Sequence, residues 1–209
     1  MSANQLLHNY LDECPLIAIV RGVTPAEAEA IGDAVYDSGI RIIEVPLNSP
    51  DPLKSIGILA SRFGERMLVG AGTVLTAGQV AQVAETGGRI IVSPDTNAEV
   101  ISATAEAGLV SCPGYFTPSE AFAAIRAGAT ALKLFPAEGA TPGLLKAQLA
   151  VLPSDIPYLV VGGVKPDNMR RWLEAGATGF GLGGGLYKPG QSAVDTLEKG
   201  RAYVAGLEQ

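Results

Sequence analysis

Short apolar runs alternate with longer Ala-rich stretches of helical periodicity along the chain, and this alternation constrains the fold more than any other feature. Eight apolar runs are candidate strands, at residues 16–20, 42–45, 67–69, 89–92, 109–112, 131–135, 158–161 and 179–182. The stretches that predict helices include residues 25–37, 77–86, 98–107, 118–127 and 166–175. Regular alternation requires parallel strands with right-handed crossovers, and eight such units can close into a barrel without free edges. The predicted fold class is therefore α/β, a single (β/α)8 TIM barrel.

Glycines and prolines mark the ends of the predicted helices. A glycine precedes the next strand in the pairs Ser38-Gly39, Thr86-Gly87, Ala107-Gly108, Ala127-Gly128 and Ala175-Gly176. Glycine is preferred there because the residue that follows a helix commonly adopts a left-handed conformation. The Thr-Pro pairs at 24–25 and 117–118 and the Lys-Pro pair at 165–166 predict helix starts, since proline fits the first turn.

Composition limits the size and the surroundings of the protein. The 209 residues are 47% apolar and 17% charged, which predicts one domain over residues 1–209, with residues 1–14 as a short helix packed on the barrel. We expect a cytoplasmic protein, because the sequence shows neither a secretory signal pattern nor an apolar run that could span a bilayer. A net charge of −6, with only 15 Lys and Arg, argues against nucleic-acid or membrane partners.

Cys14 and Cys112 lack metal-ligand spacing and His8 is the only histidine, so we expect neither a metal site nor a cofactor.

Charged residues stand inside or directly after predicted strands, where a barrel carries its functional groups. Lys133 lies between Leu132 and Leu134, so alternation should point it into the barrel while the leucines face the helices. Burial should lower the pKa of its ammonium group and expose a nucleophilic amine, with Arg21 as a nearby cation. Glu44, in the second strand, suits a general acid and base. The alternative is that Lys133 and Glu44 form a structural ion pair.

Other residues near the strand ends are candidates for substrate binding. Thr73, in the turn GAGT, could bind a substrate carboxylate or serve only the turn. Phe135 could form an apolar wall of the site or pack at the barrel rim. The clusters VVGGV (160–164) and GLGGG (181–185) predict a phosphate site, because glycine amides can approach an anion after the last two strands of a barrel. Simple turn formation is the alternative for both clusters.

The chain resembles a known family in six segments, which occur in that family's order and spacing: IAIVRGVTP, IIEVPLNSP, VGAGTVL, ALKLFPAE, VVGGV and GLGGGLY. The family is that of the 2-keto-3-deoxy-6-phosphogluconate and 2-keto-3-deoxy-6-phosphogalactonate aldolases, and the resemblance runs nearly end to end. It implies that Lys133 forms a Schiff base, that Glu44 shuttles protons, and that Arg21 and Thr73 bind the pyruvate-like end. The phosphate end would be held by Gly162, Gly163, Gly183 and Gly184, next to Val161. The resemblance also implies a homotrimer.

Within the family, EVPLNSP and Val161 resemble the phosphogalactonate branch, since the gluconate branch typically has an arginine near Asn48 and a threonine at 161. The implied reaction is reversible cleavage of 2-dehydro-3-deoxy-6-phospho-D-galactonate to pyruvate and D-glyceraldehyde 3-phosphate. Relatives usually carry serine in place of Gly184, so phosphate binding would rest on backbone amides. One alternative is a 2-dehydro-3-deoxy-6-phosphogluconate/4-hydroxy-2-oxoglutarate aldolase. Another is a non-aldolase phosphosugar-binding barrel, or an isomerase that uses Glu44 as base and Lys133 as an electrostatic clamp.

Overall fold

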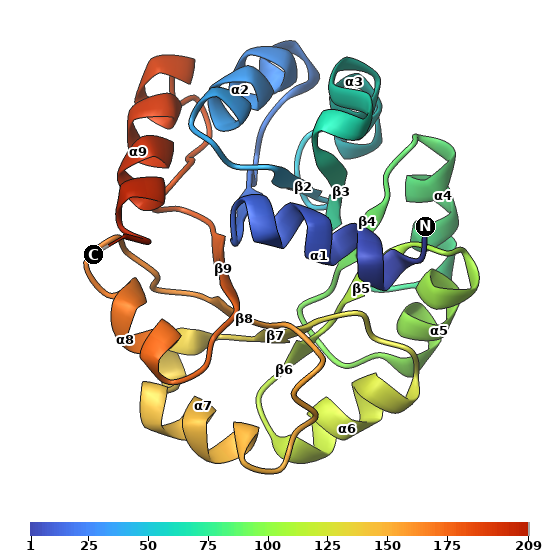
Figure 1. The fold of residues 1–209 in the computed structure, drawn as a ribbon. Helices are drawn as coiled ribbons and strands as arrows, with labels where there is room; N and C mark the ends of the chain where they lie inside the picture. The colour runs from blue at the N-terminus through green and yellow to red at the C-terminus, as the bar shows by residue number, and fades with distance from the viewer. Residues whose placement is uncertain (209) are drawn as a thin grey trace.

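The computed structural model describes residues 1–208, and their strands and helices alternate around a barrel (Figure 1). These residues form nine strands, paired in parallel in the order β5-β4-β3-β2-β1-β9-β8-β7-β6. The strands are β1 Leu16–Ile19, β2 Ile42–Pro46, β3 Leu68–Gly72, β4 Ile90–Val92, β5 Val110–Cys112, β6 Gly114–Tyr115, β7 Leu132–Leu134, β8 Tyr158–Val161 and β9 Gly179–Leu182. The helices are α1 Ala3–Glu13, α2 Pro25–Asp37, α3 Pro52–Phe63, α4 Ala77–Glu85, α5 Ala98–Glu106, α6 Pro118–Arg126, α7 Pro142–Leu149, α8 Met169–Glu174 and α9 Ala193–Ala205, with short 3-10 turns η1 Gly64–Arg66 and η2 Ala137–Gly139.

The barrel closes where β5 and β6 meet. These two strands lie at opposite ends of the strand order, yet only Pro113 separates them in the chain. Proline has no N–H to donate and so interrupts a strand. The segment that leads into β7 and β7 itself bridge the interruption, because Thr130 N donates to Ser111 O at 2.8 Å and Lys133 N donates to Pro113 O at 2.9 Å. Residues 110–115 thus occupy one position of the barrel, and the predicted eight-stranded TIM barrel is confirmed.

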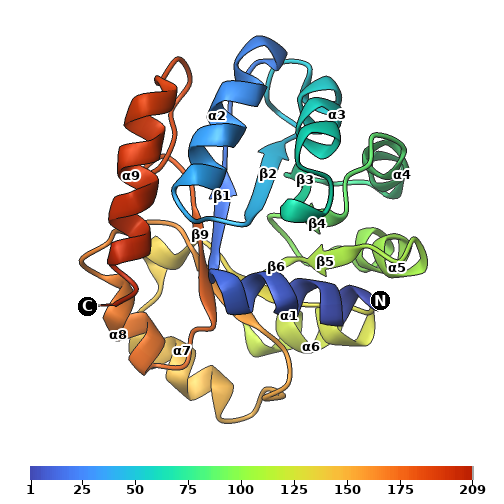
Figure 2. The same cartoon turned by 45° about the horizontal axis from the view of Figure 1, so that its top comes forward.

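Two groups of buried side chains fill the molecule. The larger lies between the strands and the surrounding helices and includes Leu132 and Leu134. The smaller fills one end of the barrel interior with the strand residues Ile17, Ile42, Leu68, Ile90, Val92, Val110, Cys112 and Leu159, with Ala131 just before β7, and with Leu7, Tyr10 and Leu11 of α1. Helix α1 lies across this end of the barrel (Figures 1 and 2). The opposite end, where the parallel strands finish, is therefore left for a site.

The predicted helix ends agree with the structure at all five glycines, which have positive φ values of 104°, 86°, 71°, 101° and 104° at residues 39, 87, 108, 128 and 176. Helix α6 also begins as predicted, because Thr117 N donates to Glu120 Oε2 at 2.7 Å in a capping box. The predicted start of α8 at residues 165–166 is wrong, since the helix begins at Met169. The physical reason is Asn168, whose side chain binds the backbone of the preceding turn and holds it as a loop.

Candidate active site

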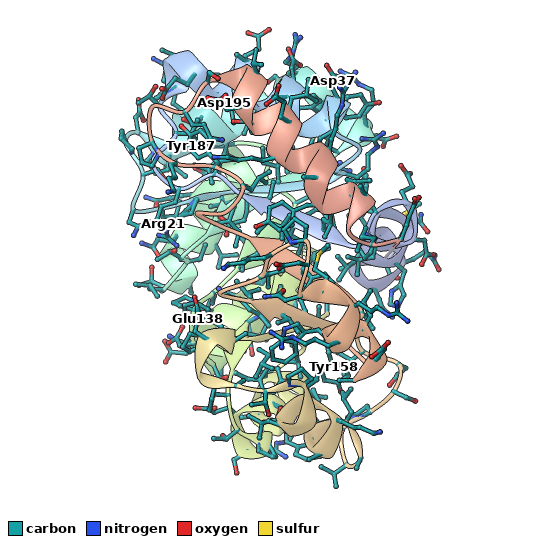
Figure 3. The ribbon with its side chains drawn as sticks, turned by 90° about the vertical axis from the view of Figure 1, so that its left-hand side faces the viewer. Arg21, Asp37, Glu138, Tyr158, Tyr187 and Asp195 are labelled. Atoms are coloured by element: carbon teal, nitrogen blue, oxygen red, sulfur yellow. The ribbon has the colours of Figure 1, made fainter. Side chains whose placement is uncertain are left out.

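A cavity of about 530 Å³ opens where the strands end. All ten residues predicted to form the site line it: Arg21, Glu44, Thr73, Lys133, Phe135, Val161, Gly162, Gly163, Gly183 and Gly184. Figure 3 shows three residues of its wall, Arg21, Glu138 and Tyr187, on the side of the molecule away from α1. The structure thus brings together residues that are spread over most of the chain.

Lys133 is buried at the base of this cavity. Strand β7 directs its side chain inward, and only 6% of the residue is exposed. Its Nζ donates to Ser93 O at 3.4 Å and lies 4.4 Å from the centre of the Phe135 ring. Burial lowers the pKa of Lys133, while the opposing charge of Glu44 raises it and the charge of Arg21 lowers it further. A larger fraction of this amine is therefore neutral, and nucleophilic, than for a lysine in water.

Glu44 projects into the same space from β2 and is 2% exposed. Gly72 at the end of β3 provides the room, because a Cβ atom there would overlap the carboxylate. Burial raises the pKa of Glu44 to about 7, against the charges of Lys133 and Arg21, which lower it. Its Oε2 has no hydrogen-bond partner within residues 1–208, and no salt bridge joins it to Lys133 in that range. The two side chains therefore share the cavity without the direct contact of a salt bridge.

Arg21 is held by the loops that follow β2 and β3. Its Nη1 donates to Asn48 Oδ1 and, at 3.4 Å, to Thr73 Oγ1. Thr73 has a φ of +55°, a left-handed conformation that costs roughly 1 kcal/mol in a residue with a Cβ. Gly22 N donates to Ser49 Oγ at 2.9 Å, which ties the loop after β1 to the loop after β2. A guanidinium and a hydroxyl placed side by side can bind a carboxylate.

The structural reason for glycine differs between the two clusters. Gly162 and Gly163 have φ values of +112° and +64°, and a Cβ atom at Gly162 would overlap the Glu138 carboxylate. Backbone conformation and packing thus account for this pair. Gly183 and Gly184 have nothing within 4 Å of an added Cβ atom, so their lack of side chains leaves open space in the cavity.

Sequence reasoning missed five polar residues of the cavity and its support: Asn48 as the partner of Arg21, together with Glu138, Lys165, Tyr187 and Lys188. Each stands within a few residues of a strand end, so the rule that selected Lys133 and Arg21 could have found them. Among residues 1–208, no three His, Cys, Asp or Glu side chains are grouped as metal ligands. No helix within the same residues is long and apolar enough to cross a membrane.

The sequence matches the KDPG and KHG aldolase family over residues 7–197. The chain belongs to this family. It is 47% identical over 195 residues to a 2-dehydro-3-deoxy-6-phosphogalactonate aldolase of Escherichia coli K12, covering 93% of this chain and 95% of that protein. A probable 2-dehydro-3-deoxy-6-phosphogalactonate aldolase of Rhizobium meliloti is 46% identical, covering 94% and 92%.

Among solved structures, one described as native KDPGal superposes with a TM-score of 0.92 at 46% identity, covering 94% of this chain and 95% of that one. The resemblance to this aldolase family inferred from six sequence segments is therefore confirmed.

Proposed function

We propose that the protein is a class I aldolase that cleaves 2-dehydro-3-deoxy-6-phospho-D-galactonate reversibly to pyruvate and D-glyceraldehyde 3-phosphate. The observation that carries this proposal is Lys133, a buried amine of lowered pKa in a cavity that it shares with Glu44. This is the arrangement that imine formation needs, because a protonated amine cannot attack a ketone. Family membership and the names of the two relatives support the substrate.

In the first step, the neutral Nζ of Lys133 attacks the C2 ketone, and a C–N bond forms while the carbonyl oxygen takes up a proton. Loss of that oxygen as water gives a protonated imine. Arg21 and Thr73 bind the C1 carboxylate and so orient C2 toward Nζ. Glu44, with a pKa near 7, can both give and take the protons of this step.

In the second step, the C4 hydroxyl loses its proton and the C3–C4 bond breaks. The electron pair of that bond moves toward the imine nitrogen and leaves an enamine, while C4 departs as the aldehyde carbon of D-glyceraldehyde 3-phosphate. Protonation of the enamine at C3 and hydrolysis by water release pyruvate and restore Lys133. We expect Glu44 to reach these protons through water, and its Oε2, which has no partner within residues 1–208, is available to accept a hydrogen bond. The proposed steps use only side chains and water.

The phosphogluconate epimer is the second candidate substrate, because it differs from the first only at C4. Asn48 and Val161 resemble the phosphogalactonate branch, and the names of the two relatives support the galactonate epimer. Side-by-side kinetics with both epimers test this choice. We expect the galactonate epimer to have the higher kcat/KM, and equal values would refute the assignment.

The test of the chemistry itself is trapping with pyruvate and borohydride, followed by peptide mass spectrometry. Reduction of the imine leaves a stable secondary amine, which we expect on Lys133 alone. No adduct, or full turnover in Lys133→Ala, would instead favour an isomerase or a phosphosugar-binding barrel. Exposed lysines such as Lys146 serve as internal controls for nonspecific adducts.

We also propose that residues 1–209 act as one catalytic domain within a cytoplasmic homotrimer, as predicted from the sequence. Each chain has a mass of 21.5 kDa, so light scattering should give three times that value. A monomer or dimer mass would contradict the trimer.

A further inference from the structure

Two lysines of the cavity take no part in the proposed Schiff-base steps. Lys165 follows the glycine pair after β8, and Lys188 follows the glycine cluster after β9. Both line the cavity and are exposed at its open end. Neither ammonium group is in a salt bridge within the described part of the chain, residues 1–208.

The backbone that carries Lys165 is fixed by three hydrogen bonds with side chains. Lys165 N donates to Asn168 Oδ1 at 3.0 Å, and Asn168 Nδ2 donates to Gly163 O at 2.9 Å. The hydroxyl of Tyr203 donates to Val164 O at 2.9 Å. The glycine pair and the lysine are therefore held in one fixed loop, while the lysine side chain stays available.

The backbone around Lys188 is held in a similar way. Gln191 N donates to Lys188 O at 3.0 Å, and Gln191 Nε2 donates to Leu186 O at 2.7 Å. A Cβ atom on Gly22 would collide with the ring of Pro189, so the two residues are in close contact. The loop of Lys188 therefore lies beside Arg21, the residue that precedes Gly22. Lys188 thus stands on a supported loop at the same mouth of the cavity.

The charges around the glycines of the cavity bear on how an anion could bind there. Backbone amides offer only partial charges, and Gly184 brings no hydroxyl. The carboxylate of Glu138 lies against Gly162 and lines the cavity, so it repels an incoming anion. Positive charge near the glycines would therefore favour the binding of a phosphate dianion there.

We propose that Lys165 and Lys188 bind the phosphate group of the substrate and offset the charge of Glu138. This inference rests on the proposed function, because it takes the substrate to be a phosphorylated sugar acid. The two lysines are binding residues and not catalytic ones, so they act on KM and leave the chemical step alone.

The test compares Lys165→Met, Lys188→Met and the double variant with Lys146→Met, which removes an exposed lysine outside the cavity. For the phosphorylated sugar acid, we expect KM to rise roughly threefold to tenfold per lysine, with kcat nearly unchanged. For the same sugar acid without phosphate, kcat/KM should not change. The arginine variants should restore KM, and added salt should raise KM less in the double variant than in the wild type.

Binding of inorganic phosphate, measured by calorimetry on the wild type and the double variant, separates this inference from the proposed function. If the wild type forms no imine with pyruvate, the aldolase proposal fails, yet weaker phosphate binding in the double variant still supports the two lysines. Phosphate binding equal to that of the wild type would overturn the inference. So would an equal loss of kcat/KM with and without the phosphate group on the substrate.

Discussion

The two ends of the cavity are built from different kinds of structure. At the end proposed to bind the keto acid, Lys133 and Glu44 project from strands and are 6% and 2% exposed, and Arg21 and Thr73 lie on loops beside them. At the end proposed to bind the phosphate, the charged side chains are Glu138, Lys165 and Lys188, all exposed and all on the connections that follow strands. Burial is what shifts the pKa values at the first end, whereas charges at the second end stay in contact with water.

This difference assigns separate tasks to the two ends. A buried group with a shifted pKa can exchange protons or attack carbon at neutral pH, and it is fixed by the barrel. Exposed charges attract and hold an anion at modest strength, which lets the product leave. Substitutions at the buried end should therefore change kcat, and those at the open end should change KM.

The largest effect is expected from Lys133→Met, which removes the amine and keeps most of the side-chain volume. The kcat should fall by roughly a thousandfold or more, because the imine can no longer form. Steady-state assays of lyase activity check this, with Lys146→Met as the matched control and circular dichroism to verify folding. Residual turnover within tenfold of the wild type would mean that the reaction does not pass through an imine on Lys133.

Glu44→Gln should lower kcat by about a hundredfold to ten-thousandfold, because the amide cannot carry protons. Pyruvate should still be trapped on Lys133 by borohydride, although more slowly. In the wild type, kcat should fall as pH drops through about 7, where Glu44 takes up a proton and stops acting as a base. A pH profile that keeps this limb in the Gln variant would assign it to another group.

The stability of the wild type should depend on pH in a direction set by the raised pKa of Glu44. Glu44 titrates near 4.5 when unfolded and about 7 when folded, so the folded state binds more protons between these values. Stability therefore falls as pH rises through that window, and the full penalty of roughly 3 kcal/mol is present above about pH 7. Glu44→Gln removes it, so we expect the variant to gain more stability at pH 8 than at pH 5 in urea unfolding. An equal gain at both values would contradict a raised pKa.

Two glycine substitutions compare the ends directly. Gly72→Ala places a Cβ atom on the Glu44 carboxylate, so the buried group must move and kcat should fall by about tenfold. Gly183→Ala meets nothing within 4 Å, so folding and kcat should be kept while KM rises a few-fold as the phosphate loses space. Kinetics and thermal unfolding of both variants check this, and a kcat loss in Gly183→Ala alone would reverse the comparison.

The fold could be predicted from the sequence because its signals are local and repeated. The glycines that end helices, such as Gly39 and Gly128, act through their own φ values. The alternation of apolar runs and helical stretches predicts strands and helices without knowledge of their contacts. The exceptions arose where a side chain or a proline acts on its neighbours. Asn168 delays the start of α8, and Pro113 divides one barrel strand into β5 and β6.

The chemical residues of the site could also be predicted, since a lysine and a glutamate inside apolar strands are conspicuous. Their surroundings could not be, because contacts across a barrel depend on strand register and closure. The hydrogen bonds of Arg21 to Asn48 and Thr73 join three loops, and no sequence spacing reveals them. The same holds for the packing of Glu138 against Gly162. This contact explains the glycine by packing, whereas the sequence had suggested room for an anion.

The smallest effect is expected from Glu138→Gln at the open end. Removing a negative charge beside Gly162 should lower KM for the phosphorylated substrate, and solvent screening limits the gain to about twofold or threefold. Initial-rate assays at low and high salt check this, with Glu85→Gln on α4 as an exposed control outside the cavity. The gain should shrink at high salt, because repulsion between exposed charges is screened. If KM rises instead, Glu138 accepts a hydrogen bond from a substrate hydroxyl, and the open end then recognises the sugar chain as well as the phosphate.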